Sequence, residues 1–262
     1  MIIGSVLLLM TKGLNLGVDF KGGLLLEIRT QEKADLSHLR TQLATLNLGD
    51  PKLQEFGSDR DVLIRLDSSH HAKESMEKIK NVLGPHIDYR RIETVGPKVS
   101  QDLIDNGLMA LSFCLVGMMV YIWFRFEWQY GLCGILSLIH DAVIVLGFYA
   151  LSGIEFSETA LVALLTTIGY SINDSVVIYD RLRENLRKYK TTPIGDVINL
   201  TANETLSRTL LTSGTTLVAL AALYGFGGSV IESFALPIWV GIFIGTLSSI
   251  YISANFLLFF DL

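Results

Sequence analysis

The sequence predicts an α-helical integral membrane protein that carries a small α+β domain outside the membrane. Half of its 262 residues are hydrophobic and only 18% are charged, against roughly 25% charged in ordinary soluble domains. The charged residues gather in the segment before residue 100 and in one later connector, while the rest of the chain consists of long apolar runs. All lysines and arginines lie at or before Arg208, so the final apolar part has none.

Five apolar segments lie after residue 105, each close to the roughly 20 residues that a membrane helix needs. They cover residues 106–124, 130–151, 159–179, 209–226 and 234–260. Met1–Met10 is also apolar, but as a helix it reaches only about 15 Å, half of a hydrocarbon core of about 30 Å. We interpret residues 1–19 as the outer half of a first membrane helix whose beginning is missing, which gives six spans with the first incomplete. A signal peptide is the alternative, but it requires a basic region and a small-residue cleavage site that this segment does not show.

The distribution of basic residues predicts the orientation in the membrane. The connector that follows Tyr179 is rich in arginine and lysine, whereas the connectors at 152–158 and 225–233 carry only acidic residues. By the positive-inside rule the basic connector is cytoplasmic. The predicted organisation is therefore a partial first helix (1–19), an extracytoplasmic domain (20–104) and a five-helix membrane domain (105–262) that has its cytoplasmic loop at 181–207 and its C-terminus inside.

The extracytoplasmic segment shows the hydrophobic periods of alternating strands and helices. Apolar residues at helical spacing (Leu36, Leu39, Leu43) predict a helix for which Asp35 is the expected N-cap. In chain order we expect a strand at 23–30, a helix at 35–46, strands at 52–56 and 61–66 joined by a turn, a helix at 70–83 and a strand at 86–94. This βαββαβ order is that of the ferredoxin-like fold.

Asp174 lies near the inner end of the third complete span. A charged carboxylate there costs about 2.5–3.5 kcal/mol, so a functional role or a partner is expected. It shares a helix face with Tyr170 and Ser171, and on the next span Arg208 opens a similar stripe of threonines at 212, 215 and 216. We expect the two stripes to face the protein interior and Asp174 to pair with Arg208. For Arg208 alone, an ordinary flanking residue on the cytoplasmic side is the alternative.

Asp141 forms a second buried titratable site together with His140, in the middle of the second complete span. Adjacent residues on a helix point about 100° apart, so the two side chains cannot both face one partner. A place in an ion path is the hypothesis for Asp141. For His140 a hydrogen bond to a neighbour is the alternative.

A few residues suggest structural rather than chemical roles. Gly241 and Gly245 form a small-residue face for close packing of the last span. Cys114 and Cys133 both lie in apolar stretches and match no metal-ligand motif, so we expect them to be small core residues and expect no metal site.

Five ordered motifs resemble those of the SecF family of bacterial protein-export membrane subunits. They are GLNLGVDFKGG (13–23), ETVGPKV (93–99), IGYSINDSVV (168–177), DRLREN (180–185) and SRTLLTSGTT (207–216). The resemblance implies a relative of the resistance-nodulation-division permeases, located in the bacterial inner membrane, that forms twelve spans together with SecD. It also implies that this assembly uses the proton gradient to pull exported chains outward, with protons as the coupling ion and no cofactor.

The resemblance assigns roles to particular positions. In the family, the aspartate of the Asn-Asp-Ser motif and the arginine that opens the next helix belong to the proton path. The expected proton path comprises Asp174, Arg208, Asp141, Asn173, Ser171 and Tyr170. Gly22, Gly23, Gly96 and Pro97 are the expected hinges between the membrane helices and the outer domain. The expected partners are SecD, the Sec channel (SecY, SecE, SecG), YajC, YidC, unfolded preproteins and membrane lipids, and no nucleic acid.

Three other functions remain as alternatives. A small-molecule or lipid exporter of the same superfamily would share the buried acid, usually in a longer chain. A scaffold of the translocon would make no use of protons. Asp141, Asp174 and the Tyr179-Asp180 pair suggest an intramembrane aspartyl protease, but the Gly-x-Gly-Asp motif of such enzymes is missing. We therefore expect a transport subunit rather than an enzyme.

Overall fold

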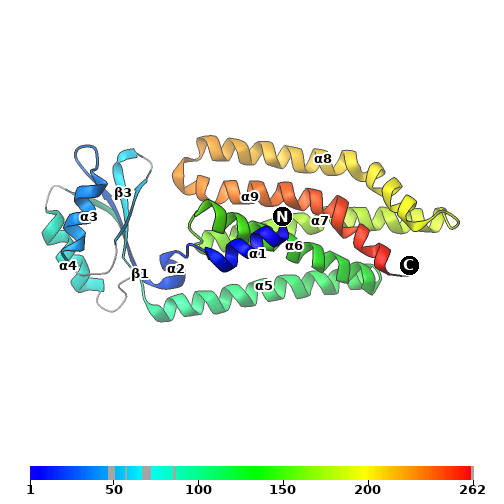
Figure 1. The fold of residues 1–262 in the computed structure, drawn as a ribbon, viewed down its shortest axis with the longest axis horizontal. Helices are drawn as coiled ribbons and strands as arrows, with labels where there is room; N and C mark the ends of the chain where they lie inside the picture. The colour runs from blue at the N-terminus through cyan, green and yellow to red at the C-terminus, as the bar shows by residue number, and fades with distance from the viewer. Residues whose placement is uncertain (47–50, 57, 67–71, 85–86, 261–262) are drawn as a thin grey trace. The chain divides into compact units, whose positions relative to one another are not determined.

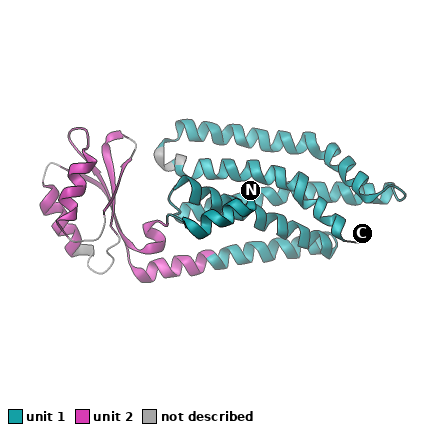
Figure 2. Cartoon of the chain, viewed as in Figure 1, with its two compact units in different colours: residues 1–15, 108–262 teal, residues 16–107 magenta. Residues whose placement is uncertain are grey.

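The fold was analysed in a computed structural model, which describes residues 1–262 except 47–50, 57, 67–71, 85–86 and 261–262. Figure 1 shows the elements in chain order, and Figure 2 shows the two compact units into which the chain divides. The first unit joins Met1–Asn15 to Leu108–Leu262, and the second is Leu16–Gly107. Each unit is described by itself.

The second unit is built on a four-stranded antiparallel sheet. Its elements are α2 (Val18–Lys21), β1 (Gly23–Arg29), α3 (Leu36–Ala44), β2 (Lys52–Phe56), β3 (Ser58–Leu66), α4 (Ala72–Leu83) and β4 (Asp88–Val95). The strands lie in the order β2-β3-β1-β4. From β1 onward the elements follow the βαββαβ order that the sequence predicts, although β3 starts at Ser58 rather than at residue 61. The predicted starts of the second helix (70–71) and the last strand (86) lie outside the described residues.

The core of this unit follows from the alternation along β1. Leu24, Leu26 and Ile28 are fully buried, as expected for every second residue of a strand that is covered on one face. Leu43 of α3 and Ile79 of α4 lie in the same buried cluster, so both helices cover that face. Each such side chain contributes roughly 1.5–3 kcal/mol on burial. The unit therefore has a hydrophobic core of its own.

Two aspartates make polar contacts that stabilise this unit, one at the start of α3 and one between β1 and β3. The Asp35 side chain accepts hydrogen bonds from the backbone N–H groups of Ser37 and His38, which confirms it as the N-cap of α3. Asp61 is buried, and its two carboxylate oxygens accept bonds of 2.7 Å from Nε and Nη2 of Arg29. This guanidinium holds the pKa of Asp61 well below its usual range.

The first unit is a bundle of long apolar helices. They are the short α1 (Ile2–Thr11) and the longer α5 (Pro97–Arg125), α6 (Trp128–Ser152), α7 (Glu158–Lys188), α8 (Ile194–Phe226) and α9 (Gly228–Ser248). The first turns of α5 belong to the second unit. After α9 the chain continues as a π-helix (Ser249–Ser253) and a 3-10 helix (Asn255–Phe259). Five helical segments within the described residues are long and apolar enough to cross a membrane, the last of them Ser233–Phe259. This confirms the five predicted complete spans, whereas α1 is shorter than a full span.

The structure differs from the prediction between the third and fourth spans. The expected cytoplasmic loop at 181–207 is mostly helical, because α7 continues to Lys188 and α8 already starts at Ile194. Polar contacts tie the two extensions together, since Glu204 of α8 accepts hydrogen bonds from Arg181 and Asn185 of α7. We expected a loop because the charge of this segment indicates that it lies outside the membrane. Charged residues such as arginine and glutamate are also good helix formers, so charge does not distinguish a loop from an exposed helix.

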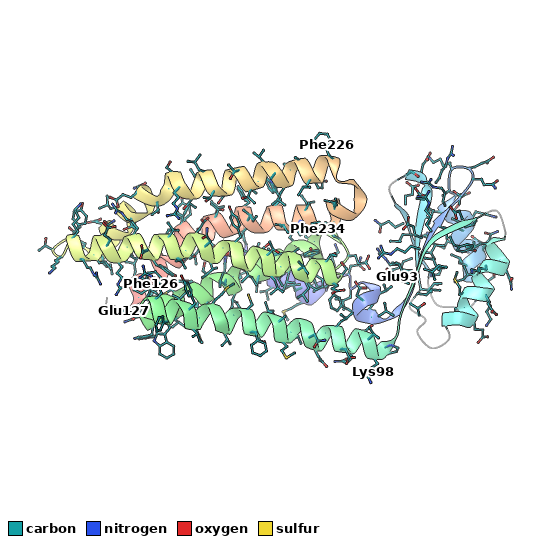
Figure 3. All side chains as sticks on the ribbon, turned by 180° about the vertical axis from the view of Figure 1, so that it is seen from behind. Glu93, Lys98, Phe126, Glu127, Phe226 and Phe234 are labelled. Atoms are coloured by element: carbon teal, nitrogen blue, oxygen red, sulfur yellow. The ribbon has the colours of Figure 1, made fainter. Side chains whose placement is uncertain are left out.

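Burial separates central from peripheral helices. In the most apolar windows of α6, α7 and the last span, 50%, 44% and 61% of residues are buried, against 11% in α5 and 17% in α8. The peripheral helices present large apolar side chains outward, among them Phe113, Val218 and Phe226, of which Phe226 is labelled in Figure 3. Helices α6, α7 and α9 therefore form the centre of the bundle.

The short helix α1 packs on α6. Ser5 of α1 is buried against Gly147, where a Cβ atom would collide with the serine side chain. This close approach fixes α1 against the central helices.

Candidate functional site

Asp174 of α7 is buried inside the bundle, with 3% of its surface exposed. Its carboxylate accepts a hydrogen bond of 3.3 Å from the Ser213 hydroxyl of α8. Ser213 in turn accepts a bond of 2.7 Å from the Thr246 hydroxyl of α9. A hydroxyl donor at 3.3 Å is distant, since such bonds usually measure 2.5–3.0 Å. The buried carboxylate therefore joins three helices but receives little compensation for its charge.

The expected ion pair between Asp174 and Arg208 is not formed. Arg208 is exposed on the surface of α8, and none of the ion pairs between described residues joins it to Asp174. The expected interior stripe of α8 is likewise exposed at Thr212 and Thr215. The buried polar face is instead Thr201, Thr205, Thr209 and Ser213. Both series repeat at helical spacing, so the sequence pattern could not choose between the two faces.

The polar stripe of α7 does lie against its neighbours. The Tyr170 hydroxyl lies 3.1 Å from the Thr216 hydroxyl of α8, which is one point where the two expected stripes meet. Ser171 points to another helix, α6, where its hydroxyl donates to Asp141. Asn173, next to Asp174 in the sequence, is exposed on this chain. The expected path residues of α7 thus contact different neighbours rather than one shared cavity.

Asp141 is completely buried and has three close polar neighbours. Its carboxylate accepts hydrogen bonds of 2.5 Å from Ser171 and 2.7 Å from Ser248, and Nδ1 of His140 lies 2.9 Å from its other oxygen. The neighbour that His140 contacts is thus Asp141 itself. These contacts join α6, α7 and α9 through one carboxylate.

Sequence reasoning missed the partners of both carboxylates. Ser213, Thr246 and Ser248 carry no charge, so nothing in the sequence marks them as partners of a carboxylate. Their signal is weak, because serine and threonine in apolar helices also bond to their own backbone, as Thr246 and Ser248 do here.

Two glycines of α9 allow this close arrangement. A Cβ atom at Gly241 would lie 2.5 Å from the Thr167 side chain, and one at Gly245 would lie 3.0 Å from that of Ser171. Without side chains at these points, α9 approaches α7 closely, and Ser248 of α9 and Ser171 of α7 both donate to Asp141 of α6. Directly after Ser248 the helix changes to a π-helix, a form often found at functional sites.

The four expected hinge residues lie at the two ends of the sheet unit. Gly22 precedes β1 and Gly23 is its first residue, and their φ angles of 75° and 146° are values that residues with a side chain rarely adopt. Gly96 follows β4 and accepts a hydrogen bond from the Ser100 backbone, and Pro97 is the first residue of α5. The glycine pair therefore has a backbone conformation that requires glycine.

A bundle of apolar helices with two buried carboxylates, together with a small antiparallel sheet unit, defines a polytopic membrane protein with a polar site inside the bundle. Comparison with known families gives the assignment. The family model described as "Protein export membrane protein SecD/SecF, C-terminal" matches residues 74–262, and the "SecD/SecF GG Motif" matches residues 7–34. The chain belongs to the SecD/SecF family.

Relatives place the chain within this family more narrowly. The protein translocase subunit SecF of Rickettsia bellii is 47% identical over 252 residues, which are 94% of this chain and 83% of that protein. The corresponding subunit of Desulfurispirillum indicum is 44% identical over 260 residues, 95% of this chain and 83% of that protein. The chain is thus a SecF-type auxiliary subunit of the Sec protein translocase.

Solved structures show the same fold. The crystal structure of SecDF from Thermus thermophilus, described as a translocon-associated membrane protein, matches with a TM-score of 0.88 at 36% identity over 98% of this chain. A SecDF structure in a "super-membrane-facing form" matches with a TM-score of 0.71 at 36% identity over 97% of this chain. The chain spans about a third (36%) of each of those longer chains.

Proposed function

We propose that this subunit works with a SecD partner and uses the proton gradient to drive a late stage of protein export across the bacterial inner membrane. The observation that carries the proposal is Asp174, a buried carboxylate whose nearest donor is a hydroxyl at 3.3 Å and which has no cation within ion-pair distance among the described residues. Keeping such a charge inside a membrane costs about 2.5–3.5 kcal/mol. Binding a proton removes that cost.

Proton exchange at Asp174 can drive a conformational change because the same carboxylate joins three helices. Loss or gain of its charge changes the strength of the bond from Ser213, and through Thr246 the contact reaches α9. One charge that crosses 100 mV releases about 2.3 kcal/mol, enough to shift a two-state equilibrium about fiftyfold. The rest of the proposed path comprises Asp141, Ser171, Tyr170, Asn173 and Arg208.

The exposed polar face of α8 supports a membrane partner. Arg208, Thr212 and Thr215 are exposed on a helix that is long and apolar enough to span the membrane. Polar groups on such helices rarely face hydrocarbon. The two similar solved structures are of SecDF, and this chain matches about a third of each. SecD is therefore the proposed partner that covers this face and brings Arg208 into the path, in an assembly of twelve spans.

The sheet unit is the proposed ferredoxin-like domain outside the membrane, and Gly22-Gly23 and Gly96-Pro97 are the proposed hinges that transmit helix movements to it. The basic end of α7 and the start of α8 then lie in the cytoplasm, together with the C-terminus. Further proposed partners are SecY, SecE, SecG, YajC, YidC and unfolded preproteins. In this mechanism the subunit catalyses no covalent reaction and needs no cofactor besides protons.

Reconstitution tests the proposal against its alternatives. The chain, a SecD partner and the Sec channel are placed in inverted vesicles, and the rate of preprotein export is measured with and without an imposed proton gradient. We expect the gradient to accelerate export only when both subunits are present. Export that does not respond to the gradient would favour a scaffold, whereas gradient-driven movement of small molecules or lipids without preprotein would favour an exporter.

A further inference from the structure

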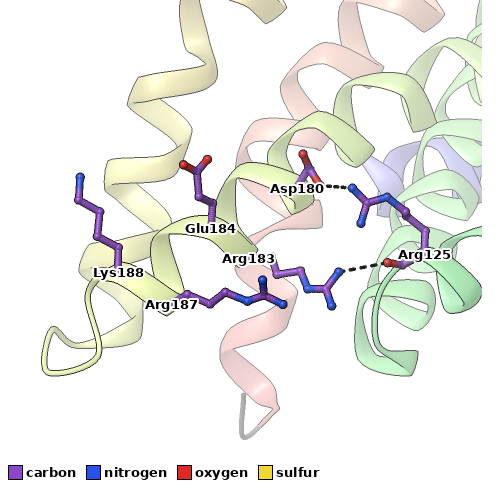
Figure 4. Close-up of a pocket in the computed structure, with 6 residues that line it drawn as sticks. All are labelled: Arg125, Asp180, Arg183, Glu184, Arg187 and Lys188. Atoms are coloured by element: carbon purple, nitrogen blue, oxygen red, sulfur yellow. Dashed lines mark hydrogen bonds and ion pairs between the residues drawn. The ribbon is translucent and has the colours of Figure 1, made fainter.

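The basic ends of α5 and α7 border an open pocket of about 530 Å³ that the proposed proton path does not use. Figure 4 shows its lining, which comes from the last residue of α5 and from the final turns of α7. The lining residues are Arg125, Asp180, Arg183, Glu184, Arg187 and Lys188. Four of the six are cationic and two are anionic, so the pocket carries an excess of positive charge.

Both carboxylates of the pocket are already engaged by arginines. Asp180 accepts a hydrogen bond of 2.5 Å from Arg125, and Glu184 accepts one of 2.6 Å from Arg181, which is not part of the lining. Figure 4 shows the Glu184 carboxylate pointing away from the guanidinium groups of Arg183 and Arg187. The pocket therefore has no free carboxylate among its lining residues.

Arg183 and Arg187 have no counter-charge in the described part of the chain. The Arg183 guanidinium donates to the backbone oxygen of Arg125 at 3.3 Å, and no ion pair of a described carboxylate includes either arginine. The two residues are one helical turn apart and extend toward the same side of α7 (Figure 4). Like charges at this spacing repel each other. An anion bound between the two guanidinium groups would remove this repulsion.

The surroundings indicate which kind of anion. Trp123 and Phe124 lie in the last turn of α5, Trp128 starts α6, and all three are large and exposed. Tryptophan and other aromatic residues gather at the level of the lipid headgroups. The pocket therefore lies beside the boundary between membrane and water, where phosphates of phospholipids are the most abundant anions. Guanidinium groups bind phosphate oxygens in pairs of parallel hydrogen bonds.

We propose that this pocket binds the phosphate of an anionic phospholipid, with Arg183 and Arg187 as its ligands and the exposed aromatic residues beside the glycerol and upper acyl chains. Arg125 contributes indirectly, since it neutralises Asp180 and so removes one negative charge from the pocket. A zwitterionic lipid fits less well because its ammonium group would meet the same cations. The site would anchor the basic end of α7 to one leaflet.

The test uses the full chain in lipid nanodiscs that contain phosphatidylglycerol and phosphatidylcholine. Retained lipids are identified by native mass spectrometry, and the affinity for phosphatidylglycerol is measured by titration. The double variant Arg183→Gln, Arg187→Gln should bind phosphatidylglycerol about thirtyfold more weakly, since each basic residue near an anionic surface changes affinity about fivefold. A control variant, Lys98→Gln, Lys190→Gln, loses the same charge outside the pocket, and its affinity should change less than threefold.

Three outcomes would overturn the proposal. In the first, the double variant retains phosphatidylglycerol at the wild-type affinity while its melting temperature shows that it is folded. In the second, the charge-matched control loses as much affinity as the double variant, which would mean a diffuse electrostatic effect. In the third, inorganic phosphate alone displaces the lipid at millimolar concentration, which would mean a site for free phosphate. If the double variant does not fold, Arg187→Gln alone is measured instead, and it should bind phosphatidylglycerol about fivefold more weakly.

Discussion

Replacing Asp174 by asparagine tests the central residue of the proposed proton path. The substitution keeps the shape of the side chain and its ability to accept the bond from Ser213, but the group can no longer carry a proton. A hydrogen bond to a charged group contributes about 1.5–3 kcal/mol, and burying that charge costs about 2.5–3.5 kcal/mol. Because the bond from Ser213 is long at 3.3 Å, it offsets only part of this cost, so the substitution should raise the stability of the protein by about 1–2 kcal/mol.

The functional effect should be much larger. Without a proton carrier the roughly 2.3 kcal/mol available per charge at 100 mV no longer reaches the helices, so the acceleration of export by the gradient, up to about fiftyfold, should disappear. Export is measured in inverted vesicles with and without an imposed gradient, and thermal stability is measured in detergent. Asp196→Asn, which removes an exposed carboxylate from the first turn of α8, is the matched control. If the Asp174 variant still responds to the gradient like the wild type, the proton proposal is wrong.

The same experiment distinguishes the observed arrangement from the ion pair that the sequence led us to expect. Breaking a buried ion pair by removing one partner usually costs 3–5 kcal/mol, and a second substitution that removes the other partner then restores stability. Because Asp174 and Arg208 form no direct ion pair and Arg208 acts on the carboxylate only as a more distant charge, adding Arg208→Leu to Asp174→Asn should restore far less than about 3–5 kcal/mol of stability. Recovery of stability in the double variant would contradict this reasoning.

The remaining predictions concern stability. Because Arg29 holds the pKa of Asp61 below its unfolded value of about 3.9, the free energy of unfolding of the sheet unit should fall as pH decreases below about 4, and Asp61→Asn should flatten this dependence in denaturant titrations. Gly241→Leu should reduce the free energy of unfolding by about 1–3 kcal/mol, seen as a lower melting temperature, because the new side chain collides with Thr167. Thr167→Ala in the same chain should recover part of this loss. Asp141→Leu leaves the buried Ser171 hydroxyl without its acceptor, at a cost of about 1–3 kcal/mol, and leaves Ser248 with only its bond to Gly245, so hydrogen exchange in the central helices should accelerate.

Local patterns in the sequence predicted most of the helices and strands. The five spans follow from the length of their apolar runs, and the βαββαβ order follows from hydrophobic periods of two and of about four residues. The N-cap at Asp35 follows in the same way, because a capping side chain bonds to backbone groups two or three residues ahead. Such features depend on residues that are near in the sequence, where the covalent geometry fixes which groups can meet.

The sequence also determined which residues are chemically unusual. Asp141 and Asp174 stand out as carboxylates in apolar helices, and both are buried in the structure. Composition did not show that the connector between the third and fourth spans is helical, because the same charged residues occur in loops and in exposed helices.

Tertiary structure alone decided the partners of the two carboxylates. Ser248 is 107 residues from Asp141, and Ser213 is 39 residues from Asp174. Helical spacing says which residues share a face, but the rotation of each helix about its axis is set by packing against its neighbours, as where Gly241 fits against α7. On α8 this rotation turned Ser213 inward and Arg208 outward, so the residue that the pattern favoured as a partner lies on the surface and a neutral serine takes its place.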